Sequence, residues 1–417
     1  MLTPWRARRR AWSGAWLATW GWLLLVGVVA CPELLLASPE GSPVLVGLDA
    51  EFGIENSTSA DAIRAGMRVA IEEINTAGGL LGGRPLRLLE KDNRSVPARG
   101  VQNIKEFAQV EDLVAVFCGK FSPVVIEELP TIHQLKIPLL DPWAAGDPII
   151  DNGYHPSYVF RLSLRDGWAM SAMIAHAMRR GADHFGLLLP NTAWGRSGQA
   201  AARLYAETHP DVHIVSERWY NWGDKSLTES YQKLLDAGAQ AILLLANERE
   251  GSLLIRNVAA LPASERVPIL SHFGVTGGKL AQLAGEAMRQ VDFSVVQTYS
   301  FIGDPSPLAH KVVATIGRIL GVNGARAIPS PVGAAHAYDL THILALAINR
   351  AGSTDRAAIR DALEHLGRYE GLVRLYDPPF TPERHEALRP ELLFMARYDP
   401  DGAIVRITDP QPILPKP

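Results

Sequence analysis

The stretch LVAVFCGKFSP (residues 113–123), continued by IPLLDPWAAGD (137–147), carries the pattern that decides the fold. The apolar run LVAVFC is typical of a strand that is buried on both faces. Ser122 and Pro123 suit the start of a helix, with Ser122 as the capping residue, and the free backbone N–H groups there favour an anion. IPLLD is a second predicted strand. Loops that follow neighbouring parallel strands meet at one sheet edge, so we expect half of a small-molecule site here.

The same alternation of strand and helix extends in both directions along the chain. Two series of about 120 residues each follow it, which predicts an α/β fold of two doubly wound, parallel-sheet lobes. The further predicted strands are 44–48, 86–90, 185–189, 213–220, 241–246, 268–271 and 291–301, with β-like pieces at 371–375 and 392–398; the predicted helices include 63–74, 98–109, 168–179, 195–208, 227–237, a helix from Gly251, 307–320, 335–350 and 356–366.

The overall charge balance excludes one class of partner. Lys and Arg number 41 against 44 Asp and Glu, a net charge of −3 in 417 residues. Such a chain offers no electrostatic case for binding nucleic acid. We therefore expect no nucleic-acid partner.

The N-terminus has the layout of an export signal. Four arginines between residues 6 and 10 precede an uncharged run at 15–30, and VVAC at 28–31 resembles a lipoprotein cleavage box. We expect residues 1–31 to be a signal segment, residues 32–43 to be a tether, and the mature protein to reside in the periplasm. A lipid anchor through Cys31, cleavage after Ala37 and an uncleaved anchor remain open. The other cysteine, Cys118, ends an apolar run and is interpreted as a core residue.

Signatures of enzymes, cofactors and metals are missing. No G-x-G-x-x-G opens a helix, and the GGK at 277–279 lacks the Ser or Thr of a phosphate-binding loop. His336, Asp339 and His342 are spaced by three on one predicted helix, which spreads them over its surface. We expect neither a metal nor a cofactor, and we do not expect an enzyme.

Several motifs together resemble a known family. They are VLVGLDAEFG (44–53), AIEEINTAGGLLGGRPLRLLEKDN (70–93) and LLPNTAWGRSG (188–198), with the FSP turn and LLDPWAAGD between them. The mature chain is similar to the type 1 periplasmic solute-binding proteins of the leucine/isoleucine/valine-binding kind. The resemblance implies a monomer whose two Rossmann-like lobes, joined by three chain crossings, close on a small organic ligand.

The resemblance also implies where the lobes divide and what they serve. Lobe I would comprise residues 44–162 and 300–366, and lobe II residues 163–299 and 367–417, with crossings near 162–164, 297–300 and 366–370. The ligand would be delivered to an inner-membrane ABC permease. Alternatively, the protein would report the ligand to a membrane signalling protein; an α/β enzyme is a third hypothesis.

Family positions transfer to eight residues of this chain, and Phe121 is predicted as a further aromatic residue of the same cleft. Ser122 falls on the hydroxyl that binds a ligand carboxylate, and Trp194 falls on the aromatic residue of the second lobe that covers the ligand. The acid that pairs with a ligand ammonium falls near Phe273. The other predicted ligand-binding residues are Ser59, Phe121, Trp143, Ala144, Ala145 and Asn247.

Two of these positions depart from the family pattern. Phe273 cannot pair with an ammonium, and Ala145 lacks a hydroxyl, so an ordinary branched-chain amino acid is not expected as the ligand. A replacement acid from Glu51, Asp141 or Glu248 remains open, as do plain structural roles for them. The aromatic residues Phe121, Trp143, Trp194 and Phe273 suit an aromatic acid, an amide or a quaternary ammonium.

Overall fold

A five-stranded parallel sheet forms the first lobe of the computed structural model, which describes residues 41–408. Its strand order is β2-β1-β3-β4-β5. All six side chains of β3 are buried because helices cover both faces of the sheet. The strands are β1 (Val44–Ala50), β2 (Leu86–Asp92), β3 (Leu113–Cys118), β4 (Leu139–Asp141) and β5 (Val159–Arg161).

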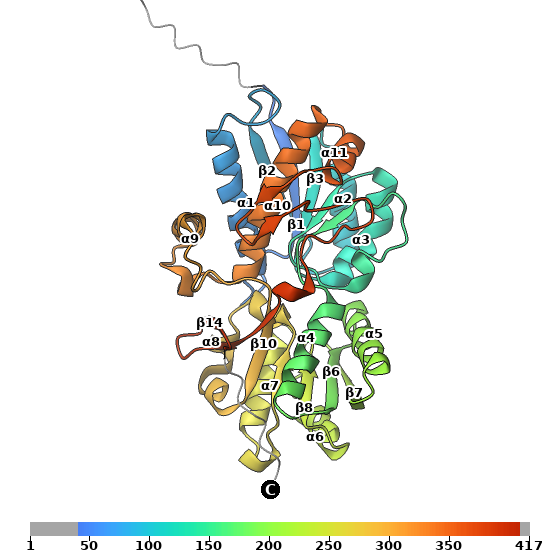
Figure 1. Cartoon of the computed structure of the whole chain (residues 1–417), viewed down its shortest axis with the longest axis vertical. Helices are drawn as coiled ribbons and strands as arrows, with labels where there is room; N and C mark the ends of the chain where they lie inside the picture. Colours follow the sequence, from blue (N-terminus) through green and yellow to red (C-terminus); the bar gives the residue numbers. More distant parts are fainter. Residues whose placement is uncertain (1–40, 409–417) are drawn as a thin grey trace, which may run out of the picture. The chain divides into compact units, whose positions relative to one another are not determined.

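Helices from both ends of the chain complete this lobe. They are α1 (Ser59–Thr76), α2 (Pro97–Ala108), α3 (Ser122–Leu135), α9 (Pro307–Leu320), α10 (Pro331–Ala351) and α11 (Arg356–Leu363). Helix α10 packs along α1 (Figure 1). The two backbones approach so closely at Gly66 that a Cβ there would lie 2.1 Å from the carbonyl oxygen of Ala334. Only glycine permits this contact, which joins the early and late parts of the sequence.

The second lobe is built on a seven-stranded sheet of order β14-β13-β10-β9-β8-β6-β7. Its strands are β6 (His184–Pro190), β7 (His213–Tyr220), β8 (Ala241–Leu244), β9 (Ile269–Ser271), β10 (Phe293–Gln297), β13 (Phe394–Tyr398) and β14 (Ile404–Arg406). Its helices are α4 (Asp166–Arg179), α5 (Ala193–Thr208), α6 (Thr228–Asp236), α7 (Glu248–Ala259) and α8 (Leu280–Ala284). Strands β6 to β10 are parallel, whereas β13 pairs with β10 in antiparallel fashion. The predicted two-lobed, doubly wound α/β fold is confirmed.

Short elements lie between these helices and strands. They are the 3₁₀ helices η1 (Asp147–Ile149), η2 (Ala263–Glu265), η3 (Phe273–Gly277), η4 (Gly285–Gln290), η5 (Ala325–Ala327) and η6 (Pro390–Leu392), and the two-stranded sheet of β11 (Tyr369–Glu370) and β12 (Leu375–Tyr376). The segment between α11 and β13 bonds to the first lobe. Asp339 of α10 accepts hydrogen bonds from the Leu372 and Val373 backbone N–H groups, and His385 bonds to the Val159 carbonyl of β5. We therefore propose that the third crossing lies between residues 387 and 394, later than the 366–370 that the resemblance implied.

The structure differs from the sequence-based expectations at several places, of which three concern the site and its neighbours. Ser122 is the first residue of α3 but does not cap it, because its hydroxyl is engaged elsewhere. Strand β5 was not predicted, since three residues show no periodicity. Helix α10 begins at Pro331, four residues before the predicted start. The predicted export signal and Cys31 lie outside the described residues, and within 41–408 no helix has the length and hydropathy to cross a membrane.

Candidate functional site

A small cavity lies between the carboxyl-end loops of the two sheets. The first lobe lines it with residues of the β3–α3 and β4–β5 loops, and the second lobe with residues that follow β6, β7, β8 and β9. The lining residues are Lys120, Phe121, Ser122, Pro123, Trp143, Ala145, Trp194, Trp222, Asn247, His272, Phe273 and Gly274. The cavity therefore stands where open α/β sheets bind their ligands.

The loop after β4 is held rigidly in place. Asp141 Oδ1 accepts hydrogen bonds from the backbone N–H groups of Trp143 (2.9 Å) and Ala144 (2.7 Å). The buried Arg161 guanidinium also donates hydrogen bonds to this loop, to the carbonyls of Ala144 (3.2 Å) and Gly146 (2.9 Å). Burial raises the pKa of Asp141 to about 6, although Arg161 and these bonds act against the rise. Asp141 Oδ1 therefore shapes the loop, and Asp141 is not among the residues that line the cavity.

The Ser122 hydroxyl faces the same loop. Its oxygen accepts a hydrogen bond of 3.1 Å from the Gly146 N–H, which explains why it does not cap α3. A serine hydroxyl has one proton to donate besides its two acceptor sites. Ser122 therefore links the two first-lobe loops and keeps a donor for a group in the cavity.

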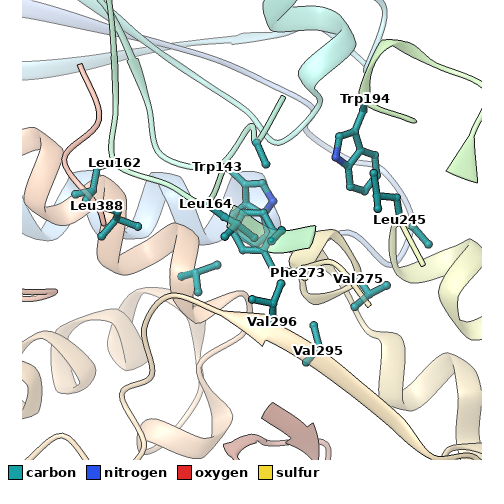
Figure 2. Close-up of a cluster of buried hydrophobic side chains, with 14 of the residues drawn as sticks. Trp143, Leu162, Leu164, Trp194, Leu245, Phe273, Val275, Val295, Val296 and Leu388 are labelled. Atoms are coloured by element: carbon teal, nitrogen blue, oxygen red, sulfur yellow. The ribbon is translucent and has the colours of Figure 1, made fainter. Parts of the chain in front are cut away.

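Aromatic side chains from both lobes meet across the cavity. Trp143 of the first lobe stacks on Phe273 of the second, with ring centroids 5.3 Å apart and an interplanar angle of 29°. Figure 2 shows these two rings against each other, with Trp194 beside Leu245. The edge of Trp222 meets Phe121 with centroids 5.3 Å apart. Such offset and edge-to-face contacts are favourable for aromatic rings, so the walls are apolar and shaped for flat groups.

One ion pair connects the lobes beside the cavity. The Lys120 ammonium lies 2.8 Å from Glu248 Oε2, and their side chains are 1% and 5% exposed. The same ammonium donates to Ser57 Oγ (3.1 Å) and to the Gly277 carbonyl (3.4 Å). Nearby, the Ser57 and Gly278 backbones form an isolated antiparallel bridge between the lobes. Charge and backbone contacts therefore both hold the second-lobe loop against the first lobe.

Two further acids lie close to the site without lining it. Glu51 accepts a 2.6 Å hydrogen bond from Ser59, and burial raises the pKa of Glu51 although the Lys120 charge opposes the rise. Asp166 accepts a 3.1 Å hydrogen bond from the Trp194 indole N–H and lies 3.2 Å from His272 Nε2. The Gly274 N–H donates to His272 Nδ1 (3.2 Å), whereas His272 Nε2 has no hydrogen-bond partner among the described residues. The buried Asp166 carboxylate thereby fixes Trp194 and lies beside His272.

Most of the residues proposed from the sequence come together here. Phe121, Ser122, Trp143, Ala145, Trp194, Asn247 and Phe273 line the cavity. Ala144 is fully buried behind it, and Ser59 is bonded to Glu51. Lys120, Trp222 and His272 were missed. Lys120 could have been noticed as a charged residue directly after a buried strand, whereas the loop positions of Trp222 and His272 gave no such signal.

The side chains nearly fill this space. The cavity measures about 10 Å³, roughly the room that one water molecule needs. A ring-sized ligand therefore requires the lobes to separate or the aromatic side chains to turn. Among residues 41–408, no group of three or more His, Cys, Asp or Glu side chains is placed to hold a metal ion.

Known proteins resemble this chain over most of its length. Residues 53–403 match the family described as periplasmic binding protein. The Leu/Ile/Val-binding protein homolog 3 of Brucella melitensis is 24% identical over 82% of this chain and 88% of its own length. A type 1 periplasmic binding protein of Bordetella pertussis superposes with a TM-score of 0.78 at 21% identity, covering 88% of this chain and all of that one. A solute-binding protein of R. palustris in complex with benzoate gives 0.71 at 16% identity, over 89% and 97% of the two chains.

Proposed function

The chain belongs to the periplasmic binding protein family, and we propose that it captures a ring-shaped organic acid between its two lobes. As a solute-binding protein of the ABC transporter type it is a carrier rather than an enzyme. The proposal concerns which solute it carries and to which partner the solute is passed.

The composition of the cavity wall carries the proposal. Five of its lining side chains are Phe or Trp, and Lys120 is the only one with a full charge. An apolar wall suits a flat body, and an anionic group on that body would share the Lys120 ammonium with Glu248. The N-terminus of α3 adds its positive dipole end at Ser122, on the same side as Lys120. A monocarboxylate on an aromatic ring meets all of these conditions.

An α-amino acid fits this wall less well because its ammonium lacks a partner. Phe273 stands where the resemblance implied the acid, and its ring is stacked on Trp143. Glu248 is paired with Lys120, Glu51 is bonded to Ser59, and Asp141 is bonded to its own loop. The benzoate complex of a structural neighbour supports the same ligand class for this chain.

The proposal also covers the compartment in which the protein acts and the protein that receives its ligand. The basic and apolar N-terminal segment supports export to the periplasm, with a lipid anchor through Cys31 as one form of it. We propose that the protein acts as a monomer and delivers its ligand to an inner-membrane ABC permease. A signalling partner would use the same ligand site.

Titration calorimetry and thermal shift with a matched panel test the ligand class. Benzoate, phenylacetate, benzamide and leucine would be titrated into the mature protein. A ligand at 100 times its Kd should raise the free energy of unfolding by about 2.7 kcal/mol. Benzamide keeps the ring but lacks the charge, so it should bind about 10- to 150-fold more weakly than benzoate, which is the value of a charged hydrogen bond.

Two lysine variants serve as the test and its control. Lys120→Met should remove the preference for benzoate over benzamide, whereas Lys279→Met, at an exposed lysine of the neighbouring loop, should leave it unchanged. Tighter binding of leucine than of every ring acid would overturn the proposal.

A further inference from the structure

Two histidines lie side by side at the amino-terminal edge of the second-lobe sheet. His184 is the first residue of β6, and His213 is the first residue of β7. The two strands are parallel neighbours (Figure 1), and their register pairs these two residues with each other. Paired residues of neighbouring strands point to the same face of a sheet, so both imidazoles stand on one face.

The spacing of the two imidazole rings suits a shared metal ion. Their centroids lie 4.8 Å apart, and the rings are tilted by 49° rather than stacked flat. Two histidines that bind one ion through nitrogens at about 2.0–2.1 Å have ring centroids roughly 5 Å apart. Both rings reach solvent, which gives an ion a path to them.

Asp183 orients the first of these rings. Its Oδ1 atom lies 2.6 Å from His184 Nδ1. Because the carboxylate accepts the Nδ1 proton, His184 Nε2 keeps its lone pair for a metal. A carboxylate behind a metal-binding histidine also makes the ring a better ligand. No described residue forms a hydrogen bond with the His213 ring, so its nitrogens are available as well.

The backbone that carries the two histidines is fixed by hydrogen bonds within the sheet. The His213 N–H donates to the Asp183 carbonyl (2.8 Å), and the Gln240 N–H donates to the His184 carbonyl (2.9 Å). Gln240, which directly precedes β8, also accepts from the Asp183 N–H with its side-chain oxygen (2.9 Å). Side chains on such anchored strands are held more precisely than side chains on loops.

We propose that His184 and His213 bind one divalent transition-metal ion of the Zn²⁺, Ni²⁺ or Cu²⁺ kind, with Asp183 as a positioning residue. Imidazole nitrogen suits these ions, whereas Mg²⁺ and Ca²⁺ prefer oxygen. No group of three or more His, Cys, Asp or Glu side chains within residues 41–408 is placed to hold a metal ion, so the site has two protein ligands and water fills its other positions. It is therefore weaker than a structural zinc site with four protein ligands, and its ion exchanges with solution.

The ion joins an edge strand to its neighbour, far from the ligand cavity. Strand β7 stands at the edge of the sheet, next to β6. The cavity lies beyond the opposite, carboxyl ends of these strands, and the seven residues of β6 place it roughly 20 Å from His184. The ion therefore stabilises the second lobe and takes no part in holding the ligand.

Isothermal titration calorimetry tests the site on the mature protein, produced without a histidine tag. We expect one Zn²⁺ ion per molecule, tighter binding of Cu²⁺ than of Zn²⁺, and no binding of Mg²⁺ at the same concentrations. Zn²⁺ should also raise the melting temperature, because it binds the folded protein.

Variants assign the ion to these residues. His184→Gln and His213→Gln should each remove measurable Zn²⁺ binding, and Asp183→Asn should weaken it about 10- to 100-fold, as the loss of a carboxylate behind a ligating histidine does. In the absence of metal, all three variants should melt like the wild type, since they change exposed or half-exposed side chains. His310→Gln is the matched control, because His310 is an exposed histidine of α9 in the first lobe.

A spectroscopic readout separates ligation from a general effect on stability. With one equivalent of Cu²⁺, electron paramagnetic resonance of the wild type should show coupling to two imidazoles, and each histidine variant should lose one of them. Absence of Zn²⁺ binding in the wild type, or binding that is unchanged in both histidine variants, would overturn the proposal. Neither result would bear on the proposed function, because the two sites share no residue.

Discussion

Replacing Lys120 with methionine should weaken the contact between the lobes, because it removes the cation of the buried pair with Glu248. At the 2.8 Å between the ammonium and Glu248 Oε2, the Coulomb attraction is roughly 6 kcal/mol for an effective dielectric constant of about 20. Removing one partner of a buried pair costs about 3–5 kcal/mol, mainly because the other charge is left unpaired. The pair's own net contribution is smaller, since both charges were first taken from water.

Because the ion pair joins the two lobes, its loss can separate the lobes as well as unfold the protein. Glu248 regains water if the lobes separate, so part of the cost should appear as opening rather than as unfolding. In the absence of ligand, we expect Lys120→Met to raise the radius of gyration in small-angle X-ray scattering and to lower the melting temperature. Adding Glu248→Gln removes the stranded charge and should recover at least half of the lost stability.

Lys279→Met is the control for the loss of a lysine. Lys279 is exposed and forms no ion pair within the described range, so its scattering curve and melting temperature should match those of the wild type. A double variant as unstable as Lys120→Met, or scattering that is the same in all four proteins, would refute the electrostatic reasoning.

Three further substitutions test the residues that hold the loop after β4 in place. Arg161→Met leaves Glu386 and the Ala144 and Gly146 carbonyls without their buried donor, and should lower the free energy of unfolding by about 3–5 kcal/mol in urea denaturation; a loss below about 1 kcal/mol would contradict the assigned role. Burial raises the pKa of Asp141 from 3.8 to about 6, so its contribution to stability is fully present below pH 3.8 and is lost as the pH rises through 6. Asp141→Asn keeps the Oδ1 acceptor and should be more stable than the wild type by up to about 3 kcal/mol at pH 7, with the difference gone by about pH 4; parallel pH profiles would disprove this. A Cβ at Gly333 would lie 2.5 Å from the Trp143 ring, so Gly333→Ala should cost about 1–3 kcal/mol, while Gly367→Ala, where no atom lies within 4 Å, should cost little in the same thermal melts.

The alternation of elements was readable from the sequence because it is a local property. Apolar runs such as LVAVFC and the helical spacing of residues 63–74 depend on neighbours a few positions apart. The same holds for the Ser122–Pro123 helix start, although not for the bond made by its hydroxyl. Ser122 was expected to cap α3, yet a backbone N–H from Gly146, 24 residues later, takes that oxygen.

The parts of the site that escaped prediction depend on distant pairs. Lys120 and Glu248 are 128 positions apart, and Arg161 and Glu386 are 225 apart. Nothing in either local sequence indicates its partner. Motif resemblance could still place Trp143, Trp194 and Asn247, because it transfers positions in a fold. It could not show that Glu248 is already paired, which bears directly on the choice of ligand.

Strands β13 and β14 cover what would otherwise be an exposed edge of the second-lobe sheet. All five residues of β10 are buried, and β13 covers that strand with antiparallel pairing before β14 ends the sheet. A chain that stops short of Phe394 would leave β10 as an open, apolar edge, the kind that pairs with other molecules. Until β13 has paired with β10, this edge stays open to other molecules. Translation errors near the 3′ end of the message should therefore yield insoluble protein rather than a weakened binder.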